Sequence, residues 1–192
     1  LQSSSAASDV YKRQIMESTK KKLAIVTGAA RGIGLATAKL FSQYDYKVAI
    51  VDRDKNELSN LSFTNNLMKS FCYDISDFNK VDMMYQEILE WHNRVDVLVN
   101  NAGVADFGKI EMTDFKRWNE VMKTNLDGAF MCSQQAIKHL KTTKGSIINI
   151  ASISGLRAST LRVAYGTSKA AIIQLTKQQA AELGEYLSLI HI

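Results

Sequence analysis

Short apolar runs recur along the chain, separated by longer segments with a mixed pattern. The first two runs are Leu23–Val26 and Val48–Val51, and later ones cover residues 69–73, 95–99 and 146–150. Each is bounded by polar or turn-forming residues. Short apolar runs of this kind are typical of strands buried on both faces of a parallel sheet. The pattern therefore predicts five parallel strands.

Apolar residues at helical spacing fill the segments between these runs. Ile33, Ala36, Leu40 and Tyr44 follow the first run with this spacing. Further helices are predicted over residues 54–60, 78–91, 124–141 and 164–185, with a short helix in the segment before residue 124. Strands that alternate with helices indicate βαβ units with right-handed crossovers. The expected fold class is α/β: a doubly wound parallel sheet of the Rossmann type, in three layers.

Composition narrows the class of protein. The chain has 192 residues, 46% of them hydrophobic and 22% charged, which suits one soluble globular domain. No apolar run approaches the roughly 20 residues of a membrane helix, and the N-terminus lacks a signal peptide's apolar core. The net charge of +5 is modest and gathers in a short lysine run at 20–22, so neither a nucleic acid nor a membrane is an expected partner. Cys72 and Cys132 fit no metal or redox spacing, and we expect both to be buried free thiols in a reducing cytoplasm.

The two ends of the chain share an unusual relation. Residues 9–14 can be encoded by GAT GTG TAT AAG AGA CAG, whose reverse complement encodes Leu-Ser-Leu-Ile-His-Ile, the sequence of residues 187–192. This DNA resembles a transposon end used to prepare sequencing libraries. We therefore expect residues 1–14 to be a non-native leader, 15–186 to be the dinucleotide-binding domain, and 187–192 to be a non-native tail.

A glycine-rich segment, TGAARGIG at residues 27–34, joins the first strand to the first helix. Glycines at this position let the backbone approach a pyrophosphate at the N-terminus of the helix. Asp52 ends the second strand, eighteen residues after Gly34, where a carboxylate can accept hydrogen bonds from the adenosine ribose and repel a 2′-phosphate. Arg31 and Arg53 could instead meet such a phosphate. NAD is therefore favoured over NADP, although Asp52 could also serve only as a strand-end cap.

Tyr165 and Lys169 form a Y-x-x-x-K pair in the last predicted helix. Residues four apart share a helix face, with Cβ atoms roughly 5–6 Å apart. An ammonium near the phenol stabilises the phenolate, which lets the tyrosine exchange a proton close to neutral pH. This spacing predicts an acid/base pair, but many helices carry it by chance.

Five motifs together resemble those of the short-chain dehydrogenase/reductase family. Residues 27–34 are similar to its T-G-x-x-x-G-x-G turn, 100–103 to its N-N-A-G motif and 125–128 to its helix asparagine segment. Ser152 stands thirteen residues before Tyr165, the interval usual in the family. The match extends from Lys22 to Glu185. Ser152 or Asn125 alone could be a turn or cap residue, but the five motifs in order favour a catalytic set.

The resemblance implies a role for each residue. Tyr165 would exchange a proton with the substrate oxygen, Lys169 would assist it and bind the nicotinamide ribose, Ser152 would hydrogen-bond the reacting carbonyl, and Asn125 would hold a water of a proton relay. Tyr165 and Ser152 would both touch the substrate. The cofactor-binding residues implied, besides Tyr165 and Lys169, are Gly28, Arg31, Gly32, Ile33, Gly34, Asp52, Asp74, Ile75, Asn101 and Gly103. No metal is implied.

The expected function is an NAD-dependent oxidoreductase that transfers a hydride between the cofactor and a small secondary alcohol or ketone. One alternative is an NADPH-dependent 3-oxoacyl-thioester reductase of the same family, and a remote one is a non-catalytic nucleotide-sensing protein. Members of the family are usually longer, so the domain is expected to lack its last strands and to be incomplete at its C-terminus. The resemblance also implies that the full-length protein is a homotetramer or homodimer.

Overall fold

The computed structural model describes residues 21–63, 66–187 and 189–191. The strands are β1 (Leu23–Thr27), β2 (Lys47–Asp52), β3 (Met68–Cys72), β4 (Val97–Asn100), β5 (Ser146–Asn149) and β6 (Leu189–His191). The helices are α2 (Gly32–Gln43), α3 (Lys55–Ser59), α4 (Phe78–Trp91), α5 (Phe115–Met122), α6 (Gly128–Thr143) and α7 (Val163–Leu183). Shorter turns of helix are η1 (Ile110–Met112), η2 (Lys123–Asp127) and η3 (Ile153–Gly155).

The strands form one parallel sheet in the order β3-β2-β1-β4-β5-β6. The chain first moves outward from β1 to β3, then crosses over and continues from β4 to β6. The strand order therefore reverses between β1 and β4. In open α/β sheets, ligands bind at the carboxyl ends of the strands beside such a reversal. The expected Rossmann-type fold is confirmed.

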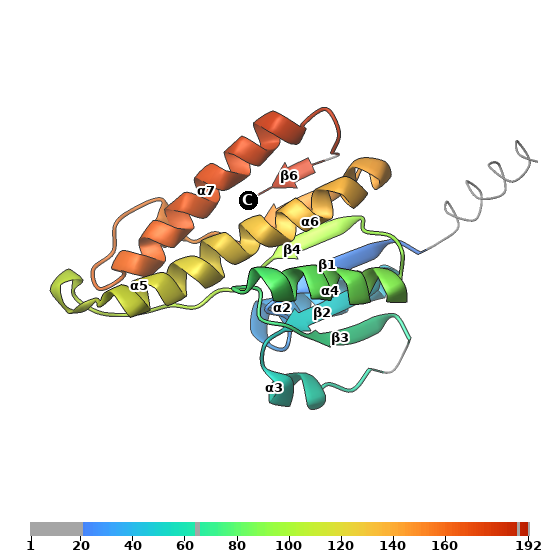
Figure 1. Cartoon of the computed structure of the whole chain (residues 1–192), viewed down its shortest axis with the longest axis horizontal. Helices are drawn as coiled ribbons and strands as arrows, with labels where there is room; N and C mark the ends of the chain where they lie inside the picture. The colour runs from blue at the N-terminus through green and yellow to red at the C-terminus, as the bar shows by residue number, and fades with distance from the viewer. Residues whose placement is uncertain (1–20, 64–65, 188, 192) are drawn as a thin grey trace, which may run out of the picture.

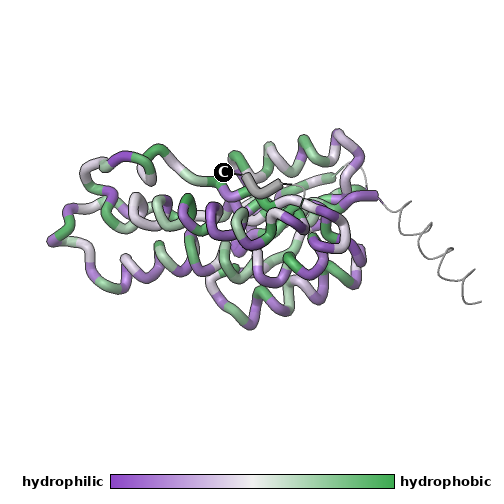
Figure 2. Tube along the Cα trace, turned by 90° about the horizontal axis from the view of Figure 1, so that it is seen from above, coloured by the Kyte–Doolittle hydropathy of each residue, from purple (hydrophilic) through white to green (hydrophobic). Residues whose placement is uncertain are grey.

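Two apolar clusters hold helices against the two faces of the sheet (Figure 1). One cluster joins alternate strand residues such as Ile25 and Leu98 to α4, α6 and the end of α7. The other joins the intervening residues, such as Val26 and Val99, to α2 and α3. Because side chains alternate along a strand, each central strand supplies both clusters. Along the helices, hydrophilic and hydrophobic positions alternate (Figure 2).

A sixth strand, which the pattern of apolar runs did not predict, extends the sheet. Residues 189–191 pair in parallel with 146–148 of β5. An outer strand carries unpaired N–H and C=O groups, and a following segment that reaches them can extend the ladder. The pairing involves residues predicted to be a non-native tail, and their origin stays a prediction. The predicted leader, residues 1–14, lies outside the described residues.

Two local expectations also change. The short helix and the long helix predicted on either side of residue 124 are continuous, from Phe115 through α5, the π-helical turn η2 and α6. Cys132 is buried as expected, but Cys72 is exposed. Phe71 points into the core from β3, and the period of two in a strand directs Cys72 to the other side. None of the helices in the described ranges is long and apolar enough to cross a membrane.

Candidate active site

The turn between β1 and α2 brings the backbone of two segments into close contact. Gly28 has φ +62° and Gly32 has φ +56°, a region that residues with a Cβ rarely adopt. A Cβ added to Gly28 would lie 2.6 Å from the Cα of Ala102, which follows β4. One added to Gly34 would lie 2.3 Å from the Gly28 carbonyl oxygen. The glycines at 28 and 34 therefore let the turn pack against the β4 loop.

Asn101 braces this turn from the side of β4. Its Nδ2 donates to the carbonyl oxygens of Thr27 and Gly28, each at 2.9 Å. In return, the Thr27 hydroxyl accepts hydrogen bonds from the backbone N–H groups of Asn101 and Ala102, both at 3.1 Å. The predicted cofactor-binding residue Asn101 thus has a clear structural role, because it fixes the shape of the turn at the point where the strand order reverses.

The N-terminus of α2 differs from that of three other helices. Asp54, Asp77 and Asp114 cap α3, α4 and α5 by accepting hydrogen bonds from backbone N–H groups of the first turn. Arg31 occupies the same position before α2, and its side chain makes no capping hydrogen bond. The first N–H groups of a helix and the positive end of its dipole attract anions. At α2 they remain accessible to a phosphate.

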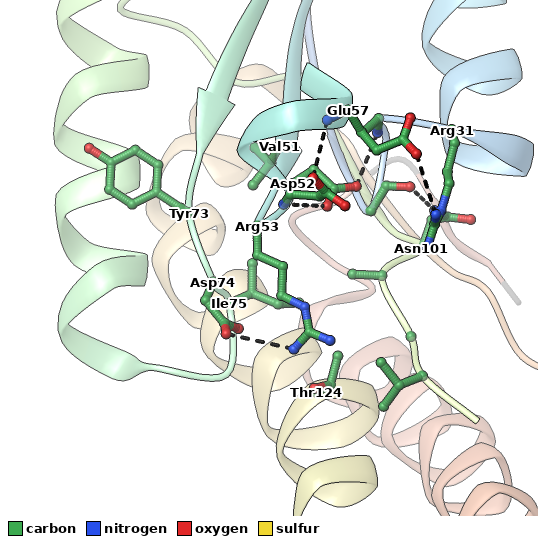
Figure 3. A pocket seen from close by; sticks show the side chains of 16 residues that line it. Arg31, Val51, Asp52, Arg53, Glu57, Tyr73, Asp74, Ile75, Asn101 and Thr124 are labelled. Atoms are coloured by element: carbon green, nitrogen blue, oxygen red, sulfur yellow. Dashed lines mark hydrogen bonds and ion pairs between the residues drawn. The ribbon is translucent and has the colours of Figure 1, made fainter. Parts of the chain in front are cut away.

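A cleft of about 260 Å³ opens beside this turn (Figure 3). Loops at the carboxyl ends of β1, β2, β3 and β4 line it, together with Thr124. Of the residues predicted to bind the cofactor, those that line the cleft are Gly28, Arg31, Asp52, Asp74, Ile75, Asn101 and Gly103. Gly32, Ile33 and Gly34 belong to the same turn without lining the cleft, and Ile33 is exposed.

Asp52 is the last residue of β2, and two backbone N–H groups hold its carboxylate in place. Its Oδ2 accepts from Ala30 N and its Oδ1 from Asp54 N, both at 3.1 Å. Each carboxylate oxygen has further lone pairs. The carboxylate can therefore accept hydrogen bonds from the two hydroxyl groups of a ribose while its backbone contacts hold it in place.

Asp74 lies across the cleft and is held in its ionised form. Partial burial acts to raise the pKa of Asp74, but hydrogen bonds from the Ser76 amide and hydroxyl, with help from Arg53, outweigh it and lower the pKa. The Arg53 guanidinium lies 3.8 Å from Asp74 Oδ2. Figure 3 shows Arg53 reaching from the end of β2 toward Asp74 and Thr124. Asp74 is thus an ionised acceptor on the cleft wall.

Lys169 is the buried cation of the site. Its side chain is on α7, only 4% of the residue is exposed, and its ammonium donates to the Ile150 carbonyl oxygen at 2.6 Å. The ammonium is 5.8 Å from the centroid of the Tyr165 ring and 3.7 Å from where a Cβ on Gly103 would lie. Burial lowers the pKa of Lys169. Lys169 and Tyr165 thus lie together, with the ammonium at the edge of the glycine-lined cleft.

Asn125 sits in the π-helical turn η2 and ties three elements together. Its Nδ2 donates to Val104 O and Ser168 Oγ, both at 2.9 Å, and its Oδ1 accepts from Val104 N at 2.8 Å. A π-helical turn within an α-helix often marks a functional site. Both amide hydrogens are in use, and one lone pair of Oδ1 remains free to accept a hydrogen bond from water.

Ser152 follows β5 and begins the turn η3. Its hydroxyl accepts a hydrogen bond from Ser154 N at 3.2 Å, so the cap role considered for it is present. Gly155 lets this turn pack directly on α7, because a Cβ there would lie 2.6 Å from the carbonyl carbon of Lys169. Close packing of η3 on α7 places the Ser152 loop beside the helix that carries the tyrosine and lysine.

The hydrogen-bond donors and acceptors of this site fit a dinucleotide. The glycine turn and the uncapped α2 suit a pyrophosphate, Asp52 suits a ribose, and Lys169 stands beyond them at Gly103. Metal binding has no comparable support, since no three His, Cys, Asp or Glu side chains converge on one point within the described ranges.

Two features of the site were missed in the sequence. Arg162 stacks 4.7 Å from the centroid of the Phe107 ring and 5.8 Å from that of Tyr165, so it joins the loops that follow β4 and β5. Asn100 and Asn149, paired in register across β4 and β5, share a hydrogen bond of 2.8 Å in the buried core. Asn149 then donates to two polar side chains of α7, namely Thr176 Oγ1 and Gln179 Oε1. For Asn100 and Asn149, the signal in the sequence was a polar residue at the end of an otherwise apolar strand.

Comparison with known proteins gives a consistent result. A family model described as short chain dehydrogenase matches residues 22–191. The chain is 34% identical over 165 residues to the meso-2,3-butanediol dehydrogenase of Serratia marcescens, covering 85% of this chain and 66% of the relative. It is also 34% identical to a 3-oxoacyl-(acyl-carrier-protein) reductase of Chlamydia trachomatis, covering 85% and 68%.

Solved structures agree with these relatives. A short-chain dehydrogenase from Streptomyces avermitilis superposes with a TM-score of 0.83 at 27% identity, over 88% of this chain and 62% of that one. The 3-ketoacyl-(acyl-carrier-protein) reductase of Brucella melitensis, complexed with NADH, gives a TM-score of 0.82 at 29% identity, over 86% and 71%. The chain thus spans about two thirds of the length of these proteins. With the model match covering most of its residues and the five motifs in their expected places, it belongs to the short chain dehydrogenase family.

Proposed function

We propose that this chain carries the cofactor-binding and proton-transfer parts of an oxidoreductase that interconverts a secondary alcohol and a ketone with NAD(H). The observation that carries the proposal is the position of Lys169, whose buried ammonium lies beside both the Tyr165 ring and Gly103 of the cleft. A buried cation is expensive unless it has partners or a function. Here it stands where a phenol and a dinucleotide would meet.

A nicotinamide held in the cleft would supply the hydride chemistry, with the hydride given to the substrate carbon in reduction and taken from it in oxidation. Tyr165 donates its phenolic proton to the carbonyl oxygen during reduction and takes it back during oxidation. Lys169 stabilises the phenolate that is formed. Ser152 donates a hydrogen bond to the same oxygen, which requires its hydroxyl hydrogen to point away from Ser154. Asn125 offers its free Oδ1 lone pair to a water that returns protons toward Lys169.

The cofactor preference is proposed from the charge around the cleft. Its charged side chains are two arginines and four carboxylates: Arg31, Arg53, Asp52, Asp54, Glu57 and Asp74. An additional phosphate on the ribose would meet a net negative lining, which opposes NADP(H). NAD(H) is therefore the proposed cofactor.

The test compares Tyr165→Phe with the unaltered chain. Removal of the phenolic hydroxyl should abolish NAD-dependent turnover across a panel of secondary alcohols and ketones. The affinity for NADH, followed by its fluorescence, should change less than threefold, because the ring and Lys169 remain. Tyr44→Phe is the matched control, since Tyr44 is 73% exposed and lies outside the cleft. Full turnover by Tyr165→Phe would refute the proposal and favour a nucleotide-sensing protein.

A second candidate is an NADPH-dependent 3-oxoacyl-thioester reductase. Its substrate class is favoured by the 3-oxoacyl-(acyl-carrier-protein) reductases among the similar proteins, and its cofactor by Arg31 at the cleft, which could bind a 2′-phosphate. Turnover of acetoacetyl-coenzyme A with NADPH, at a rate above that with NADH, would select it. Preference for NADH and for small alcohols would select the first candidate.

The setting of the enzyme is also a proposal. Both cysteines are free thiols, and burial raises the pKa of the Cys132 thiol to about 12, so it is held protonated. Exposed Cys72 would persist as a thiol in the reducing cytoplasm, which we propose as its location. A homodimer or homotetramer is proposed from the family, and light scattering coupled to size-exclusion chromatography would measure it.

A further inference from the structure

Two arginines at the cleft could bind the 2′-phosphate of NADP, which would oppose a preference for NAD. Each of them has an acidic partner. Arg31 Nη1 lies 3.6 Å from Glu57 Oε1, and Arg53 Nη1 lies 3.8 Å from Asp74 Oδ2. Figure 3 shows the two ion pairs on either side of Asp52. All five residues line the cleft. Both cations that could bind a 2′-phosphate are therefore engaged with carboxylates of the same cleft.

We propose that Glu57 determines cofactor preference through Arg31, by holding that guanidinium in an ion pair and away from a 2′-phosphate beside Asp52. The inference rests on the proposed function, because it concerns the same dinucleotide cleft. Asp74 acts on Arg53 in the same way. Glu57 and Asp74 are thus specificity-determining residues in addition to Asp52.

The backbone geometry places Arg31 within reach of a 2′-phosphate beside Asp52. Asp52 Oδ2 accepts from the N–H of Ala30, the residue next to Arg31, at 3.1 Å. The backbone of Arg31 is therefore one residue away from the backbone group that contacts the Asp52 carboxylate, the proposed acceptor for the ribose hydroxyls. Its side chain is 76% exposed and Glu57 is 42% exposed, so the guanidinium can leave its partner. Guanidinium binds phosphate bidentately, which gives a freed Arg31 a strong preference for that ligand.

The expected size of the effect follows from the exposure of the pair. Exposed ion pairs are weak, so releasing Arg31 should improve NADPH binding about two- to fivefold. NADH has no 2′-phosphate, and its affinity should change less than about 1.5-fold on the same argument. The ratio of the two dissociation constants, Kd for NADPH over Kd for NADH, is therefore the quantity to measure.

The experiment is a double-mutant cycle on the full chain. Fluorescence titrations with NADH and NADPH are made for the unaltered chain, Glu57→Gln, Arg31→Ala and the double variant. Glu57→Gln should lower the Kd ratio about two- to fivefold when Arg31 is present. It should have almost no effect when Arg31 is alanine, because the cation through which Glu57 acts is gone. Asp74→Asn with Arg53→Ala forms a second cycle.

Glu111→Gln is the matched control. Glu111 is also an exposed carboxylate paired with a cation, Lys109 at 4.0 Å, and neither residue lines the cleft. Its neutralisation should leave the ratio unchanged. An equal effect of Glu57→Gln in the presence and absence of Arg31 would show a simple charge effect and overturn the inference, as would no effect in either background. If neither dinucleotide binds to the unaltered chain, the proposed function itself fails, and the inference falls with it.

Discussion

At the scale of single residues, the site depends on side chains and backbones in unfavourable states. Lys169 keeps an ammonium in a buried position, where its main contact is the Ile150 carbonyl oxygen. Gly28 and Gly32 hold positive φ angles. Such local costs gather at functional sites because the rest of the fold compensates for them.

The buried ammonium makes stability depend on pH in a defined direction. Burial lowers the pKa of Lys169 in the folded chain below its usual 10.5, so between these two values the unfolded chain binds more protons. The free energy of unfolding therefore rises with pH in that window and gains nothing further above 10.5. In Lys169→Met this contribution is absent. Urea unfolding at pH 8 to 10.5 should show the unaltered chain gaining stability relative to Lys169→Met; a constant difference would contradict the burial effect.

Substitution of the two glycines with positive φ separates the cost of backbone strain from the cost of a steric clash. Nothing lies within 4 Å of a Cβ added to Gly32, so Gly32→Ala should lower the free energy of unfolding only by the backbone strain, about 1–2 kcal/mol. Gly28→Ala adds a clash with the Ala102 backbone and should lose about 2 kcal/mol more. It should also weaken NADH binding, since the turn must move. Denaturant unfolding and NADH titration of both variants test this, and equal losses would count against the packing argument.

At the scale of elements, buried polar contacts position the helices that carry the chemistry. Asn125 joins the π-helical turn η2 to the loop after β4 and, through Ser168, to α7. Asn149 joins β5 to α7 two turns beyond Lys169, through Thr176 and Gln179. Each buried network fixes one arrangement of its elements, because any shift would leave polar groups unpaired.

Asn149→Leu should therefore destabilise the chain strongly. It keeps a side chain of similar size but removes the buried hydrogen bonds that Asn149 makes with Asn100, Thr176 and Gln179, which should lower the free energy of unfolding by about 2–4 kcal/mol. Asn79→Leu, at an exposed position of α4, is the control and should change stability by less than about 0.5 kcal/mol. Urea denaturation followed by circular dichroism measures both; similar stabilities of the two variants would show that the network contributes little.

At the scale of the whole molecule, the sheet is the frame that gathers the site. Residues that follow β1, β2, β3 and β4 meet in one cleft because parallel strands end at the same edge. The sheet itself ends at β6, whose three residues complete the backbone hydrogen bonds of β5. On the α2 side of β5, Ile148 remains only half-buried. This part of the sheet is the less protected one.

Removal of residues 188–192 tests the importance of that edge. Without β6, the outer backbone groups of β5 are unpaired, and exposed strand edges pair with other chains. The shortened chain should form larger particles than the full chain does at the same concentration. Light scattering at matched concentrations measures this, and identical particle sizes would show that β6 gives no protection.

The sequence by itself determined the fold class, and it predicted the residues of a site. Apolar runs and helical spacing are local signals, and they predicted β1 to β5 and the βαβ order. Motifs such as Gly28 to Gly34 and Tyr165 with Lys169 also lie within short segments, so their roles could be predicted from spacing and family resemblance. The strand β6 was not predicted and the burial of Cys72 was predicted wrongly, because both depend on what lies across the sheet.

Only the tertiary structure decided which distant side chains meet. Arg31 and Glu57 are paired across the cleft, Arg162 stacks on Phe107, and Asn149 reaches α7. Nothing in the spacing of these residues predicts their contacts, because each pair is set by the packing of separate elements on the sheet. Local patterns specify elements, whereas ion pairs and buried hydrogen bonds exist only after those elements have been brought together.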